Sequence, residues 1–120
     1  MVVVMIDWMR VRELRDEIGA DGFAEVVELF LDEVEEVVAR LAARPDPLRI
    51  EQDLHFLKGS AWNLGFSAFG ALCHERERQS ARGQADGVDI PAILVAYASS
   101  RACFLAGLAK LTLGQTPDAA

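Results

Sequence analysis

Apolar residues recur at three- and four-residue steps through most of this chain, and that spacing limits what it can fold into. Residues 21–41 show it most clearly, with apolar positions at Phe23, Val26, Val27, Phe30, Val34, Val37, Val38 and Leu41. Acidic residues occupy many positions in between, as in a helix that buries one face. The only β-branched run outside such a period lies at residues 2–4. The sequence therefore predicts an all-α protein.

Capping residues and glycines divide the first half of the pattern. Asp7 is a typical N-cap, and Gly19 follows the last apolar position of a short first helix. Asp21 then precedes the long periodic stretch and predicts a separate second helix. Two helices are therefore expected before residue 44.

Three more helices are expected in the second half. Asp46 lies just before a proline and predicts the start of a third helix, which ends at Gly65, where a left-handed residue is common. A fourth helix ends in the glycine-containing stretch 82–87. The last begins near Asp89 and continues to Gly114.

Short connections between these helices favour an antiparallel up-and-down four-helix bundle with a short additional N-terminal helix. We expect the bundle to occupy residues 6–114, between an N-terminal segment at 1–5 and a flexible C-terminal tail at 115–120. Because this pattern closes a bundle within one chain, a monomer is expected.

Charge and apolar run length exclude several classes of function. The 120 residues include 19 acidic and 12 basic side chains, a net charge of −7, which disfavours binding to nucleic acid or to an anionic membrane surface. The longest nearly uncharged stretch, residues 88–100, is shorter than the roughly 20 residues that span a bilayer. Cys73 and Cys103 lie in apolar helical patterns, as buried free thiols do. We expect a cytoplasmic protein.

The expected helix around residues 50–64 has a second face that its core does not explain. Its apolar stripe consists of Ile50, Leu54, Leu57, Ala61 and Leu64. At about 100° per residue, a different group clusters roughly 150° away from that stripe. This group is Glu51, His55, Lys58, Gly59 and Trp62. His55 is therefore expected to face outward, with Lys58 and Gly59 one turn further on.

This face has a chemical interpretation and a structural one. A free imidazole is largely neutral and nucleophilic at cellular pH, and Lys58 could neutralise a phosphoryl group placed on His55. Gly59 destabilises a helix by about 1 kcal/mol relative to alanine, which suggests close approach of a partner protein. Alternatively, His55 and Lys58 are ordinary surface residues, and Trp62 packs against another helix.

Residues 53–65, Asp-Leu-His-Phe-Leu-Lys-Gly-Ser-Ala-Trp-Asn-Leu-Gly, resemble the signature of the histidine-containing phosphotransfer (HPt) domain. That signature is a histidine, two residues, Lys-Gly-Ser and a later Leu-Gly. Phe69, the pair Leu72-Cys73 and Glu77 resemble the family's following helix, and the likeness extends over roughly residues 6–110. Arg76 departs from the family pattern, which usually has a leucine there.

The resemblance implies a role for each matching residue. His55 corresponds to the phospho-accepting histidine, Lys58 to the phosphate-neutralising residue, and Gly59 to the position that admits the partner's active site. The implied docking surface consists of Glu51, Gly59, Ser60, Trp62 and Asn63. The implied partners are response-regulator receiver domains and a sensor or hybrid histidine kinase. No cofactor is expected in this chain, and Mg²⁺ is expected in the receiver.

The chain has no glycine-rich phosphate loop or Walker lysine, so ATP-dependent kinase activity is not expected. The favoured function is a phosphocarrier in which His55 takes a phosphoryl group from one receiver aspartate and passes it to another. One alternative is a non-catalytic protein-binding bundle in which His55 is incidental. A less favoured one is a metal-binding bundle, because His55, Cys73, His74 and Cys103 match no metal-ligand spacing.

Overall fold

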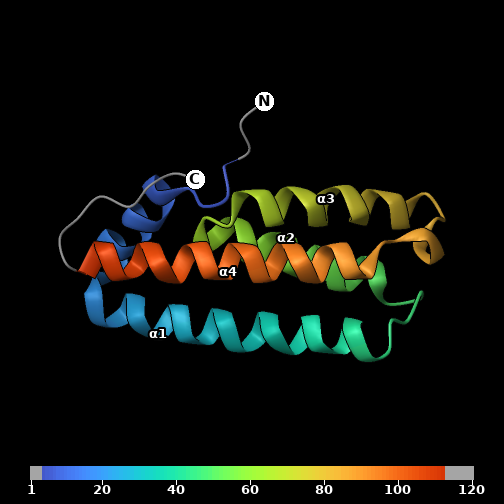
Figure 1. Cartoon of the computed structure of the whole chain (residues 1–120), viewed down its shortest axis with the longest axis horizontal. Coiled ribbons are helices and arrows are strands. Elements are labelled where there is room, and N and C mark those ends of the chain that lie inside the picture. Colours follow the sequence, from blue (N-terminus) through green and yellow to red (C-terminus); the bar gives the residue numbers. More distant parts are fainter. Residues whose placement is uncertain (1–3, 113–120) are drawn as a thin grey trace.

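Four long helices lie side by side in the computed structural model, which describes residues 4–112 (Figure 1). They are α1 (Trp8–Ala43), α2 (Ile50–Leu64), α3 (Ser67–Ala81) and α4 (Ile90–Thr112), with a single 3₁₀ turn, η1 (Ala85–Gly87), before α4. Within residues 4–112 the only β-type pairing is an isolated bridge between Ile6 and Phe66. The all-α prediction is confirmed.

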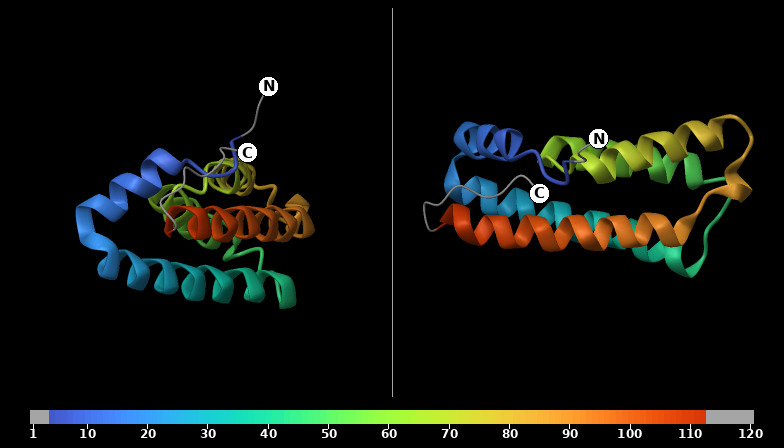
Figure 2. Two further views of the ribbon diagram at one scale, coloured as in Figure 1. Left: turned by 60° about the vertical axis from the view of Figure 1, so that its left-hand side comes forward. Right: turned by 45° about the horizontal axis from the view of Figure 1, so that its top comes forward.

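The two helices expected before residue 44 form one interrupted helix, α1. Asp7 is its N-cap, as predicted, and its side chain accepts a hydrogen bond from the Arg10 backbone N–H at 3.2 Å. Gly19 breaks the helix with φ of 80° and ψ of 162°, a conformation that favours glycine. The first segment is consequently turned away from the rest of α1 (Figure 2). The predicted cap at Asp21 is wrong, because the helix resumes directly after Gly19 and Asp21 lies inside it.

The remaining helix ends follow the sequence signals closely. Asp46 caps a turn rather than α2 itself. Its side chain accepts from the Leu48 N–H at 3.0 Å, and α2 begins only at Ile50. Gly65 is left-handed with φ of 90°, and the Asp89 side chain accepts from the Ala92 N–H at 3.1 Å. The predicted end of the last helix at Gly114, the tail at 115–120 and residues 1–3 lie outside the described residues.

Each helix packs against the next, and α4 packs back against α1. The predicted stripe of α2 is buried throughout, at Ile50, Leu54, Leu57, Ala61 and Leu64. Phe66, between α2 and α3, lies at the centre of an aromatic cluster. Its ring centroid is 4.8 Å from that of Phe30 and 5.1 Å from that of Phe104. Phe66 therefore links α1 to α4 through the core.

Polar contacts fix the position of α1 against its neighbours. Arg40 of α1 pairs with Asp53, which is buried in the first turn of α2. Glu35 of α1 accepts from the Tyr97 hydroxyl and from Nε of Arg101, both at 2.9 Å. Burial and the bond to Glu35 raise the pKa of Tyr97, so its hydroxyl stays protonated and donates.

The stretch Ile90–Leu111 of α4 is long and apolar enough to cross a membrane by length and composition, with a mean hydropathy of 1.6. The sequence analysis did not identify this stretch because it considered only the longest nearly uncharged run, whereas a spanning helix tolerates a few charges such as Arg101. Here Ile93, Tyr97 and Phe104 are buried in the bundle, and 28% of the most apolar part of this stretch is buried in all. Core helices of soluble proteins have the same composition, so this one stretch is weak evidence of a membrane span.

Candidate functional site

His55 lies on the solvent side of α2, as predicted, with 70% of its side chain exposed. The imidazole leans onto α3, where its Nδ1 lies 2.8 Å from Oε2 of Glu77. One ring nitrogen is therefore held by the protein, while most of the ring surface remains open to solvent. This combination suits a side chain that must meet a second protein.

Lys58, one turn after His55, meets the same carboxylate. Its Nζ lies 2.6 Å from Oε1 of Glu77, and only 17% of its side chain is exposed. The sequence analysis expects the Lys58 ammonium to neutralise a phosphoryl group on His55. In the structure this ammonium contacts Glu77. Glu77 thus links the imidazole and the ammonium, one through each oxygen.

The surroundings of Glu77 determine its charge and, through it, the state of His55. Burial alone raises the pKa of Glu77, but the contacts and charges of Lys58 and His55 outweigh burial and lower it below its ordinary value. Glu77 is therefore a carboxylate at neutral pH and can only accept hydrogen bonds. It follows that Nδ1 of His55 donates, which leaves the Nε2 lone pair of the neutral ring available.

Gly59 lies on the exposed face of α2, with open space around it. A Cβ added there would meet no atom within 4 Å beyond the local helix backbone. Gly70 of α3 is the opposite case, because a Cβ there would lie 2.3 Å from the ring of Trp62. Internal packing explains Gly70 but gives no reason for a glycine at position 59.

Trp62 combines the two roles that the sequence left open. The side of its ring that faces α3 covers Gly70, and its ring centroid lies 5.6 Å from that of His74. Even so, 45% of the residue is exposed. His74 is half-buried against this ring. Its Nδ1 is buried and has no hydrogen-bond partner within the described residues.

The other predicted site residues lie around this face and make no hydrogen bond or ion pair with His55 among the described residues. Glu51 is exposed one turn before His55. Asn63 accepts two hydrogen bonds from Arg10, at 3.0 Å to its backbone oxygen and 3.1 Å to Oδ1. Ser60 and Asn63 line a shallow hollow of about 140 Å³ between α1 and α2. Asn63 therefore ties the first segment of α1 to the end of α2.

Glu77 is the residue of this candidate site to which the sequence analysis assigns no role. The sequence analysis names it only as an acidic position in the family pattern, because the sequence alone does not show that α3 places Glu77 opposite His55. Cys73, one turn earlier, is fully buried, and burial together with the charge of Glu77 raises the pKa of its thiol to about 12. Arg76 is half-buried and donates to Oε1 of Gln79 at 2.8 Å, so the departure from the family pattern is accommodated within α3.

Among residues 4–112, no three or more His, Cys, Asp or Glu side chains are grouped as they would need to be to hold a metal ion. Of the side chains considered for a metal site, Cys73 faces the core and His74 lies beneath Trp62. His55 contacts Glu77 on α3 instead.

The family model of the Hpt domain matches residues 25–109. The match covers more than half of the chain, and the chain belongs to the Hpt domain family. The family carries out histidine phosphotransfer in the phosphorelays of two-component systems, where its members interact with receiver domains and histidine kinases. Comparisons with curated proteins and with solved structures gave no significant match.

Proposed function

We propose that this protein is a phosphocarrier in which His55 accepts a phosphoryl group from a receiver phosphoaspartate and passes it to the aspartate of a second receiver. The observation that carries the proposal is the exposed imidazole whose Nδ1 is held 2.8 Å from Glu77. Such an arrangement leaves Nε2 both accessible and nucleophilic.

In the proposed step, the Nε2 lone pair attacks phosphorus in line, and the bond between phosphorus and the aspartate oxygen breaks. The receiver recovers a carboxylate, and the phosphorylated ring gains a positive charge while keeping its proton on Nδ1. Glu77 accepts that proton's hydrogen bond and stabilises the charge. The return step reverses these bond changes with another aspartate as the nucleophile, so no external base is needed.

Lys58 has a second role in this proposal. An arriving phosphoryl group brings up to two negative charges close to Glu77, which repels them. The Lys58 ammonium, 2.6 Å from Glu77, can turn partly toward the phosphoryl oxygens, since a lysine stem is flexible. We propose that Lys58 divides its charge between the carboxylate and the phosphoryl group, which stabilises the loaded state.

The proposed docking surface is the exposed face of α2 and its edges. The open space at Gly59 lets a receiver approach the backbone beside His55. Around it lie Glu51, Ser60, Trp62 and Asn63. The divalent cation, Mg²⁺, is assigned to the receiver, and Lys58 is the cation that this chain contributes.

We also propose the finer architecture expected from the sequence. An antiparallel up-and-down order is supported by the short connections at residues 44–49, 65–66 and 82–89 and by the packing of each helix on the next. The domain is proposed to occupy residues 6–114 of a cytoplasmic monomer.

The test is phosphate uptake from a phosphorylated receiver by wild type and by His55→Gln, with His74→Gln as the matched control. Acid-labile, base-stable phosphate should appear on the wild type and on the His74 variant and be absent from His55→Gln. Circular dichroism should show equal helical content, since His55 supplies little buried area. Equal labelling of the His55 variant overturns the proposal, and no labelling of the wild type by any receiver favours a non-catalytic adaptor.

A further inference from the structure

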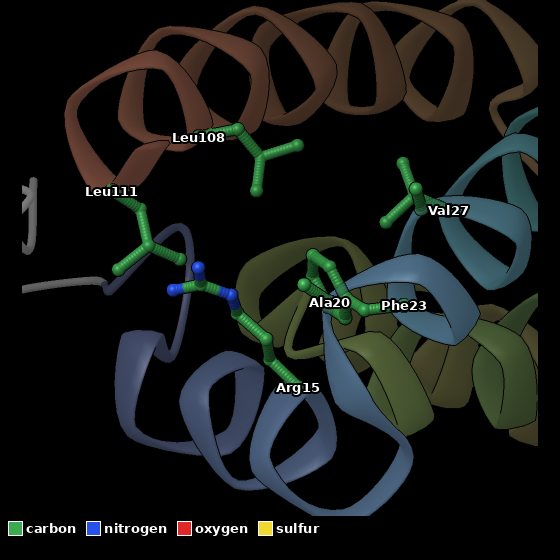
Figure 3. Close-up of a pocket in the computed structure, with 7 residues that line it drawn as sticks. Arg15, Ala20, Phe23, Val27, Leu108 and Leu111 are labelled. Atoms are coloured by element: carbon green, nitrogen blue, oxygen red, sulfur yellow. The ribbon is translucent and has the colours of Figure 1, made fainter. Parts of the chain in front are cut away.

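A cavity at the kink of α1 is separate from the His55 site. It has a volume of about 350 Å³ and lies between the two segments of α1 and the end of α4 (Figure 3). Its walls are almost entirely apolar and consist of Ala20, Phe23, Ala24, Val27, Leu108 and Leu111, with Arg15 as the exception. The volume falls at the lower end of the range typical of small-molecule pockets.

Arg15 is the only charged residue among residues 4–112 that lines this cavity. Figure 3 shows its side chain extending from the first segment of α1 toward Leu111 at the end of α4. Arg15 is half-buried, and no carboxylate within residues 4–112 pairs with it. Among residues 4–112, the partly buried arginines Arg10, Arg40 and Arg101 pair with carboxylates, and the other arginines without a polar side-chain partner are exposed. A partly desolvated guanidinium beside apolar walls favours an anion that carries its own apolar body.

We propose that this cavity binds a small amphipathic carboxylate, such as a medium-chain fatty acid. The carboxylate pairs with the Arg15 guanidinium, whose two parallel N–H groups match its geometry. The alkyl chain lies between Val27 and Leu108, which face the cavity from α1 and α4 (Figure 3). Bound in this way, the ligand contacts both sides of the Gly19 break and the end of α4, and it stabilises their arrangement.

The probe is decanoate below its micelle concentration, titrated into the full chain by calorimetry. We expect saturable one-to-one binding, a rise in melting temperature that grows with ligand concentration, and NMR shifts centred on Phe23, Val27, Leu108 and Leu111. Decanol tests the need for charge and butyrate the need for the chain, and both should bind at least about tenfold more weakly.

Two variants locate the site. Arg15→Gln should weaken decanoate binding by about tenfold or more, the usual scale for losing a charged hydrogen-bond pair. Arg12→Gln is the matched control, since Arg12 is exposed on the same segment and does not line the cavity. His55→Gln should bind decanoate as the wild type does, so this test and that of the phosphocarrier can fail separately.

Three results overturn the inference. One is no saturable binding to the wild type, which includes the case in which residues 113–120 of this chain fill the cavity. Another is equal affinity of the wild type and Arg15→Gln, or of decanoate and decanol, which excludes recognition of an anion. The third is a set of NMR shifts centred elsewhere, for example on the exposed Leu29 and Trp62.

Discussion

Two histidines at the same helix interface have opposite surroundings. His55 exposes its ring and has Nδ1 fixed by Glu77, whereas His74 lies against Trp62, and its Nδ1 is buried and has no hydrogen-bond partner among residues 4–112. The two glycines near them differ in parallel, because Gly59 faces open space and Gly70 is covered by the Trp62 ring. Residue type therefore says little about role along α2 and α3. An accessible nitrogen, a fixed proton and room for a partner distinguish the His55 region.

The strongest test of this contrast fills the space beside His55. Gly59→Gln should slow phosphoryl exchange with a receiver by roughly a hundredfold, because its side chain projects where the receiver must approach for in-line transfer. Gly59→Ala should slow it less and should stabilise the helix by up to about 1 kcal/mol. Rapid-quench transfer kinetics and thermal melts measure the two effects.

Two outcomes would contradict the prediction for Gly59→Gln, and each has a different meaning. Wild-type exchange by a stable Gly59→Gln protein excludes close docking over this turn. Unfolding of that variant shows that the glycine is needed for packing. The open space around Gly59 predicts the opposite result for stability.

A smaller loss is expected when Glu77 no longer fixes the imidazole. In Glu77→Ala, the proton of the neutral His55 ring is no longer held on Nδ1 and can occupy Nε2, and Lys58 loses its partner. Exchange should fall by about tenfold, the lower end of the losses seen when a group that orients a functional histidine is removed. Glu77→Gln retains an acceptor for Nδ1–H and should recover part of the rate. Equal rates for wild type and Glu77→Ala, measured by rapid quench, contradict a positioning role.

A substitution at Gly70 is expected to affect stability more than transfer. A Cβ at Gly70 would lie 2.3 Å from Trp62, so Gly70→Ala must displace that ring from His74. Overpacking of this kind destabilises a protein by about 1–3 kcal/mol. Urea unfolding should show the loss. Exchange measured well below the transition should fall less than in Gly59→Gln, because only Trp62 at the edge of the docking surface moves and the contact between His55 and Glu77 is kept. A neutral or stabilising effect would mean that Trp62 moves outward freely.

How much of the fold and of the candidate site could be predicted from the sequence depends on how far apart along the chain the interacting residues lie. Asp7, Gly65 and the buried stripe of α2 were predictable because caps, left-handed glycines and apolar periodicity are local. The cap predicted at Asp21 was wrong. Aspartate is a common N-cap and this one lies just after the break, but the helix already resumes after Gly19, whose positive φ makes the break.

The pairing across helices could not be predicted in this way. The position of Glu77 against His55 and Lys58 depends on the register of α3 on α2, which core packing around residues such as Phe69 decides. The burial of Nδ1 of His74 depends on the orientation of Trp62, a side chain from the other helix. The face that carries His55 was therefore predictable, and the carboxylate that prepares it was not.

The smallest expected effect concerns acid stability and sharpens the same comparison. The pKa of Glu77 is lowered in the folded protein from its ordinary value of 4.5, so folding favours the ionised form. The stabilisation that Glu77 gives is therefore complete above pH 4.5 and disappears as the pH falls through the lower folded pKa. Glu77→Gln removes this dependence. When wild type and Glu77→Gln are unfolded in urea between pH 7 and pH 3, the difference between their free energies of unfolding should shrink with acidification. His74→Gln should leave this component of the wild-type pH dependence intact. A difference that is constant over this range would mean that Glu77 contributes by packing alone, and the charged link to Lys58 and His55 would then have no measurable effect on folding.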